Sequence, residues 1–245
     1  MSGHSHWANI QHRKGAADAK RGREWSKLSR AIMVAAKNGG SDPVMNIRLR
    51  VAIEDARCVS MPKENIERAV KKGAGELDGV SFDELTYEGF GPGGVAILVE
   101  ILTDNRNRTN GEVRKIFEKG GGNMGSPGCV KHMFERKGVF SISAKDADED
   151  TLMALALDAG ADDIENLGES FEITCDPTVF IQVKAALAKA NIPIGAASIM
   201  QIGKVPVDCD PETGQKVLKL LEALDDNDDV QHVYSNLNVT DAMMA

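Results

Sequence analysis

The sequence predicts an α+β protein in which a bundle of three short helices precedes two small, open-faced α+β domains of the βαββαβ type. Three observations lead to this prediction. Apolar residues recur at helical spacing up to about residue 73, and strand and helix patterns alternate from about residue 80 onward. The connections between these patterns are short. The chain has 245 residues, 42% of them hydrophobic, which suffices for two or three small domains with cores of their own.

The N-terminal third predicts three helices. Residues 16–38 carry one apolar stripe at helical spacing and run into two glycines, so they are expected to form the first helix. Ser41-Asp42-Pro43 offers an N-cap and a proline for the first turn of a second helix, which would continue to about Cys58. A third helix is expected from about Met61 to Gly73.

The remainder of the chain alternates between strand and helix patterns. The run GVAILVEIL predicts a buried strand, and the capping-box pattern Thr109-Asn110-Gly111-Glu112 predicts that a helix opens there. An internal similarity between LALDAGADDIENL and LEALDDNDDVQHV fits two copies of a βαββαβ (ferredoxin-like) unit, although acidic loops are common. Further strands are expected at 129–134, 139–143, 170–175, 197–202 and 230–235, with helices at 149–159, 178–190 and 213–224.

Charge is distributed unevenly along the chain. The net charge of −8 taken alone argues against a nucleic-acid partner. Residues 1–75, however, carry 15 Lys and Arg against 7 Asp and Glu, while the remainder carries 14 against 30. A basic N-terminal part on an acidic body predicts one surface that attracts polyanions and another that repels them. The alternative is that the split reflects solvation alone.

The strongest candidate site is a cluster of cationic side chains near the N-terminus. Several cations on one surface are what neutralising a phosphate backbone requires, and a flexible basic arm ahead of a helix can enter a groove. The alternative is a solvated helix face, and the pattern does not distinguish DNA from RNA. The candidate residues are His12, Arg13, Lys14, Lys20, Arg21, Arg23, Lys27 and Arg30.

A second candidate is the segment Asn105, Arg106, Asn107 and Arg108, between a predicted strand and a predicted helix. Free backbone N–H groups and the helix dipole would converge there with the Arg and Asn donors, which suits an anion or nucleic-acid contact. Equally, the asparagines could satisfy turn geometry while the arginines pair with acids such as Asp104 or Glu112. The acidic pairs Asp162-Asp163 and Asp228-Asp229 are expected to be solvated turns.

Other function classes receive little support from the sequence. No nucleophile, base or metal constellation can be argued from spacing, so we expect neither an enzyme nor a cofactor. His4, His6 and His12 provide only HxH spacing, and no physiological metal is expected. The glycine clusters GFGPGG and GGGNMG lack phosphate-loop signatures and are interpreted as turns. Four widely spaced cysteines, the absence of a membrane-length apolar run and the polar start predict a cytoplasmic protein.

Five motifs in this order resemble the YebC/PmpR family of probable transcriptional regulators: GHSHWANIQHRKGAADAKRG, YEGFGPGG, DNRNRT, GGGNMG and KGVF, with DDVQHVYSNL near the end. Relatives in that family include the mitochondrial translational activator of cytochrome c oxidase. His6 departs from the lysine expected there. The resemblance implies a helical domain over 1–78, a discontinuous α+β domain over 79–136 and 206–241, and an inserted α+β domain over 137–205.

The resemblance also implies a function. Family members are described as cytoplasmic, DNA-binding regulators of transcription, so the expected partner is DNA, with no membrane and no small-molecule substrate. The alternative is a ribosome-associated translation factor that contacts RNA and relieves stalling on proline-rich stretches. The residues carried over by the resemblance are His12, Arg13, Lys14, Lys20, Arg21, Asn105, Arg106, Asn107 and Arg108.

Overall fold

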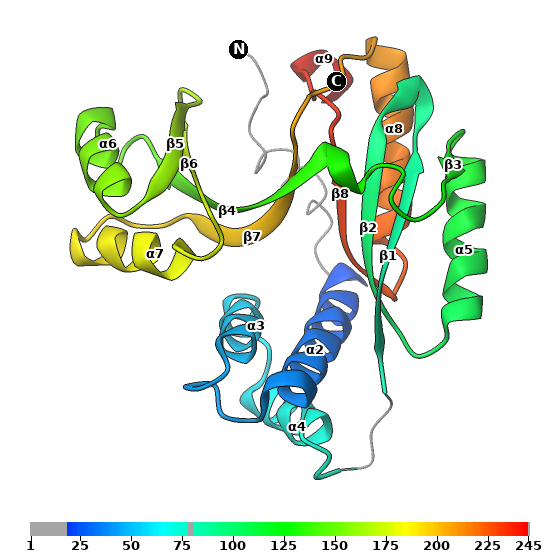
Figure 1. Ribbon diagram of the computed structural model, residues 1–245, viewed down its shortest axis with the longest axis horizontal. Coiled ribbons are helices and arrows are strands. Elements are labelled where there is room, and N and C mark those ends of the chain that lie inside the picture. Colours follow the sequence, from blue (N-terminus) through cyan, green and yellow to red (C-terminus); the bar gives the residue numbers. More distant parts are fainter. Residues whose placement is uncertain (1–18, 78–80, 245) are drawn as a thin grey trace.

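The computed structural model describes residues 19–77 and 81–244, which form three parts. Three helices pack together below two four-stranded antiparallel sheets, each covered by two helices (Figure 1). The first sheet lies on the right of the picture and the second on the left. This arrangement confirms the predicted α+β class with an N-terminal helical bundle.

The helical domain packs two short helices against one long helix. Its buried core is aliphatic, and α4 approaches α2 so closely that a Cβ atom on Gly73 would lie 2.3 Å from the carbonyl oxygen of Met33. Only glycine fits at that crossing. The helices are α2 (Ala19–Gly39), α3 (Ile47–Cys58) and α4 (Lys63–Gly73).

The start of α3 differs from the prediction. Asn46, not Ser41 or Asp42, caps the helix, because its side chain accepts a hydrogen bond from the N–H of Leu49 at 3.0 Å. The same buried amide donates to the carbonyl oxygens of Ala35 and Gly40, each at 2.8 Å. An amide can donate and accept at once, so Asn46 joins the end of α2 to the start of α3. No sequence pattern of a single helix reveals this double role.

The first sheet has the strand order β3-β1-β2-β8, and its helices α5 and α8 contact each other. Odd-numbered residues of β2, such as Ile97 and Val99, are buried with Phe117 of α5 and Leu220 of α8. Even-numbered residues such as Leu98 are buried against residues of the second sheet. Burial on both faces explains the continuous apolar run. The elements are β1 (Asp83–Phe90), β2 (Ala96–Thr103), α5 (Arg106–Lys119), β3 (Asn123–Met124), α8 (Pro211–Asp225) and β8 (Val230–Ser235).

The second sheet has the order β5-β6-β4-β7 and follows the βαββαβ succession in the chain. The first sheet instead opens with the hairpin β1–β2, and it receives α8 and β8 only after the chain has completed the second sheet. The long strands β4 and β7 run from the first sheet towards α6 and α7 (Figure 1). The elements are β4 (Phe134–Ser143), α6 (Glu149–Asp158), β5 (Ala161–Asn166), β6 (Ser170–Cys175), α7 (Phe180–Lys189) and β7 (Ala196–Gly203).

The strand expected at 129–134 is wrong, because a turn at 129–130 and a short helix at 131–133 wrap a buried carboxylate there. Glu88 accepts hydrogen bonds from the backbone N–H groups of Gly128, Val130 and Lys131 at 2.7–2.8 Å. Burial alone would raise the pKa of Glu88, but these bonds lower it below its ordinary value. Three short helical segments complete the described elements: η2 (Pro92–Gly94), η3 (Lys131–Met133) and α9 (Asp241–Met244). Of the helices described, none is long and apolar enough to cross a membrane.

Candidate nucleic-acid interface

The predicted basic cluster is only partly described by the structure. His12, Arg13 and Lys14 lie outside the described residues, and of Lys20 and Arg21 only the backbone, in the first turn of α2, is described. Arg23, Lys27 and Arg30 of the same cluster have described side chains. Their spacing of four and three residues places them on one face of α2.

This face of α2 contacts an acidic loop, which we define as residues 225–229, from the last residue of α8 to the residue before β8. Arg23 lies 3.3 Å from the carboxylate of Asp226, and Lys27 lies 3.3 Å from that of Asp225. Arg30 reaches the carboxylate of Asp229 at 3.1 Å and also donates to the carbonyl oxygen of Asp228. All three cations are therefore paired within the chain.

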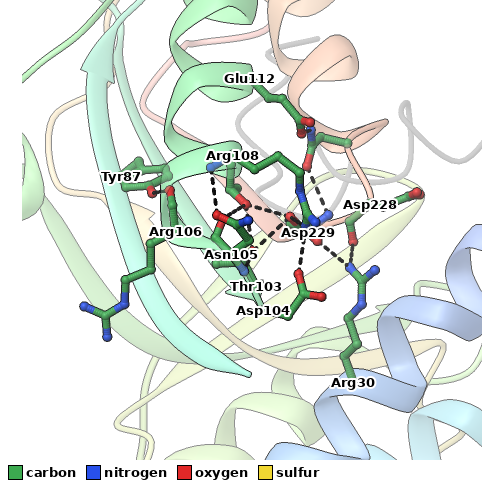
Figure 2. Close-up of polar contacts among 12 residues, drawn as sticks. Arg30, Tyr87, Thr103, Asp104, Asn105, Arg106, Arg108, Glu112, Asp228 and Asp229 are labelled. Carbon is green, nitrogen blue, oxygen red and sulfur yellow. Dashed lines mark hydrogen bonds and ion pairs between the residues drawn. The ribbon is translucent and has the colours of Figure 1, made fainter. Parts of the chain in front are cut away.

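Asp229 is the centre of this contact (Figure 2). Its side chain is 5% exposed and accepts hydrogen bonds from Thr103 at 3.0 Å, Thr109 at 2.6 Å and Arg108 at 2.7 Å. Arg30 provides a further donor at 3.1 Å. The carboxylate thereby joins the end of β2, the start of α5, the start of β8 and the side of α2.

The environment of Asp229 favours its charged form. Burial alone would raise its pKa, but the hydrogen bonds from Thr109, Arg108 and Thr103 lower the pKa below the usual 3.8. The expectation that Asp228-Asp229 is a solvated turn is therefore wrong for Asp229. The charge pattern alone gave no signal, because the donors that bury it come from residues more than a hundred positions away.

The segment Asn105–Arg108 begins α5, one turn earlier than the capping-box pattern predicts. Asn105 is the N-cap, and its side chain accepts from the N–H of Arg108 at 3.1 Å. Thr109 lies inside the helix with its hydroxyl buried, where it donates back to the carbonyl oxygen of Asn105 or to Asp229. The burial of Asp229 explains this shift, because Thr109 is needed as its donor and cannot also cap the helix.

The two arginines of the segment point in opposite directions (Figure 2). Arg106 pairs with Asp83 of β1 at 2.7 Å, which raises its own pKa and lowers that of Asp83. Arg108 pairs with Asp229 at 2.7 Å and with Asp104 at 2.8 Å, and both contacts raise its pKa. Asn107 is exposed. The arginines thus have acidic partners, as the structural interpretation of this segment expects.

An open cleft of about 540 Å³ lies where α2, the start of α5 and the acidic loop meet. It brings together the two predicted clusters, which are distant in sequence. Its guanidinium groups all face carboxylates, so in this conformation the cleft is an ion-pair network. The lining residues are Arg23, Arg30, Asp104, Arg108, Glu112, Asp226, Asn227, Asp228 and Asp229.

A second basic surface, on α4, was not singled out from the sequence. Arg68, Lys71 and Lys72 are exposed, and their spacing of three and four residues places them on one side of the helix. Ile66 and Ala69, which are buried, lie on the opposite side. Among the described residues no carboxylate within ion-pair distance of these three cations is found. A helical projection of the sequence ERAVKKG would have shown this α4 basic face.

The fold and the site place this chain in one class of proteins, in which a basic helical bundle is joined to two acidic α+β domains. Comparison with known families identifies the family itself. Residues 5–76 match the model described as the TACO1/YebC protein N-terminal domain, and residues 82–237 match the TACO1/YebC second and third domain. The chain belongs to the TACO1/YebC family, which confirms the resemblance seen in its motifs.

Similar proteins share nearly the whole chain. A probable transcriptional regulatory protein of Geobacter sulfurreducens is 54% identical over 98% of this chain and 97% of its own length. One from Rhodopirellula baltica is 54% identical, with 97% of each chain covered. Among solved structures, a conserved hypothetical protein from Aquifex aeolicus is 49% identical with a TM-score of 0.86, covering 97% of this chain and 98% of that one.

Proposed function

We propose that this protein is a DNA-binding transcriptional regulator whose helical domain contacts the phosphate backbone. The observation that carries the proposal is the α4 basic face, because exposed cations that form no ion pair with the described residues can neutralise phosphates. The names of the relatives, probable transcriptional regulatory proteins, support the regulatory part. The predicted candidates His12, Arg13, Lys14, Lys20 and Arg21 add to the positive charge of the N-terminal part of the sequence.

The charge of the remaining chain supports a defined orientation. Residues 76–245 carry 30 acidic against 14 basic residues, so a polyanion would be repelled from the two α+β domains and directed to the helical domain. Contacts from Lys and Arg to phosphates position a protein on a duplex without reading its sequence. Binding in this proposal is therefore strongly salt-dependent and depends little on base edges.

The proposal is tested with two triple variants that remove the same charge. One replaces Arg68, Lys71 and Lys72 with Ala on α4; the control replaces Arg114, Lys115 and Lys119 with Ala on exposed positions of α5. Binding of a short DNA duplex is measured across a salt series. We expect the α4 variant to flatten the salt slope by up to ~0.9 per lost phosphate contact, and the α5 control to change it little.

Equal effects of the two triple variants would contradict the helical domain as the binding surface. The same titrations with an RNA duplex and with ribosomes separate the classes of partner. Binding to RNA or ribosomes at salt concentrations that abolish DNA binding would replace the transcription proposal with the translation alternative.

A further inference from the structure

The helical domain is attached to the rest of the chain through polar contacts. In the described residues, its apolar core contains no member beyond Val70. Arg23, Lys27 and Arg30 contact the acidic loop as described above, and Arg48 pairs with Glu84 at 2.7 Å. Domains joined by ion pairs, without a shared hydrophobic core, separate more readily than domains that share one.

Two of the three ion pairs between α2 and the acidic loop are partly open to water. Arg23 and its partner Asp226 are 41% and 45% exposed, and Asp225 opposite Lys27 is 39% exposed. Pairs this open to water are weak and are screened by salt. A stronger anion in the same place can therefore replace these carboxylates.

Separation would not leave a buried charge without partners. Removing one partner of a buried ion pair is normally costly because the other charge loses its compensation. Asp229, however, keeps Thr103, Thr109 and Arg108 as donors when Arg30 leaves. Arg30 itself would pass into water or onto a new anion. The network is thus built so that α2 can depart while the remaining parts stay satisfied.

We propose that the acidic loop occupies the place of a phosphate backbone on α2, and that nucleic acid displaces it. This inference rests on the proposed function and adds an autoinhibitory contact to it. Carboxylates and phosphates both accept charge-assisted hydrogen bonds from Arg and Lys, so they compete for the same donors. Arg23 and Arg108 are 41% and 44% exposed in the open cleft, so a phosphate reaches them while the loop is still docked.

Competition of this kind lowers the apparent affinity for nucleic acid. When only a fraction of the molecules is undocked, the apparent dissociation constant is the intrinsic one divided by that fraction. Weakening the docked conformation therefore tightens binding, although no contact to the nucleic acid has been added. This is the opposite of what a loop with a purely structural role would do.

The first experiment weakens the contact between the acidic loop and α2 and leaves Asp229 in place. Asp225→Asn with Asp226→Asn is compared with Asp158→Asn with Glu165→Gln, which removes the same charge at exposed positions of the second α+β domain. We expect the loop variant to bind a short DNA duplex about three- to tenfold more tightly than this control. Equal affinities of the loop variant and the control would overturn the inference.

The second experiment measures the displacement directly. Spin labels are placed on the native Cys58 of α3, which is exposed, and on a cysteine introduced by Lys219→Cys on α8, with Cys129 and Cys209 replaced by Ala. We expect the distance between the labels to lengthen when the DNA duplex binds. An unchanged distance in the bound state would overturn the inference while the proposed function stands.

Failure of the proposed function itself is recognised separately. If neither the DNA nor the RNA duplex binds, the proposed function is wrong, and the label distance is measured with inorganic polyphosphate. A longer distance with polyphosphate supports displacement of the loop by phosphates, and an unchanged distance overturns it.

Discussion

Two basic helix faces of the same domain differ in what they contact. On α2, Arg23, Lys27 and Arg30 pair with the acidic loop. The α4 basic face instead points away from the core, and its cations form no ion pair with the described residues. In sequence both are short stripes of Lys and Arg at helical spacing. The difference teaches that such a stripe indicates an anionic partner, and that this partner can belong to the same chain.

The two faces also differ in how much of their charge reaches solvent. The side chains of Lys27 and Arg30 are 16% and 19% exposed, so a polyanion meets them only after the acidic loop moves. Arg68, Lys71 and Lys72 need no such step. We therefore expect the α4 basic face to govern initial binding and the α2 face to respond to it.

The largest expected effect comes from breaking the centre of the α2 contact. Asp229→Ala removes the acceptor of four donors and leaves Arg108 with only Asp104, so the free energy of unfolding should fall by about 2–3 kcal/mol. Asp228→Ala is the control, because that residue contributes its backbone carbonyl to Arg30. Denaturant unfolding of both variants measures the difference, and equal losses would contradict the central place of Asp229.

A smaller effect is expected on DNA binding when the cations of the two faces are removed in turn. Arg68→Ala with Lys71→Ala should weaken binding of a DNA duplex about tenfold, because the variant loses phosphate contacts and no docked loop is released in exchange. Arg23→Ala with Lys27→Ala should weaken it by only about threefold, since the same change also releases the docked acidic loop. Fluorescence anisotropy at constant salt gives both values. A larger loss for the α2 pair would reverse the proposed order of the faces.

Within the segment Asn105–Arg108, the two arginines should differ in how much they contribute to stability. Arg108→Ala should lower the melting temperature more than Arg106→Ala, because Arg108 compensates the nearly buried Asp229, whereas Asp83, the partner of Arg106, is half-exposed. Scanning calorimetry of the single variants provides the comparison. If stability stays unchanged in both while DNA binding is lost, the segment acts as a binding site, as its resemblance to the family motif implies.

The smallest expected effect is a dependence on pH. Asp229 and Glu88 have lowered pKa values in the folded protein, so the unfolded chain binds more protons and stability rises with pH in this range. Their contribution is complete well above the ordinary values of 3.8 and 4.5 and is lost as the pH falls through the lowered folded values. In Asp229→Asn the fall in melting temperature between neutral pH and about pH 3 should be shallower. A slope equal to that of the wild type would show that Asp229 does not contribute.

Local patterns in the sequence sufficed for much of the fold. Long periodic helices such as α8 and dense apolar strands such as β2 were predicted because their signals lie within one segment. β5, with the sequence ADDIEN, was missed because it is short, acidic and half-exposed, so it carries no apolar pattern. Its strand conformation comes from pairing with β6, which only the sheet provides.

The composition and order of residues by themselves determined the α+β class, the basic helical domain, the family and the presence of a cationic stripe on α2. Only the tertiary structure decided that this stripe meets residues 225–229, that Asp229 is buried, and that α4 presents exposed cations with no ion pair to the described residues. The physical reason is that periodicity records which side of a helix is polar, whereas the partner of a charge depends on distance through space. Lys27 and Asp225 are 198 positions apart in the chain and 3.3 Å apart in the fold.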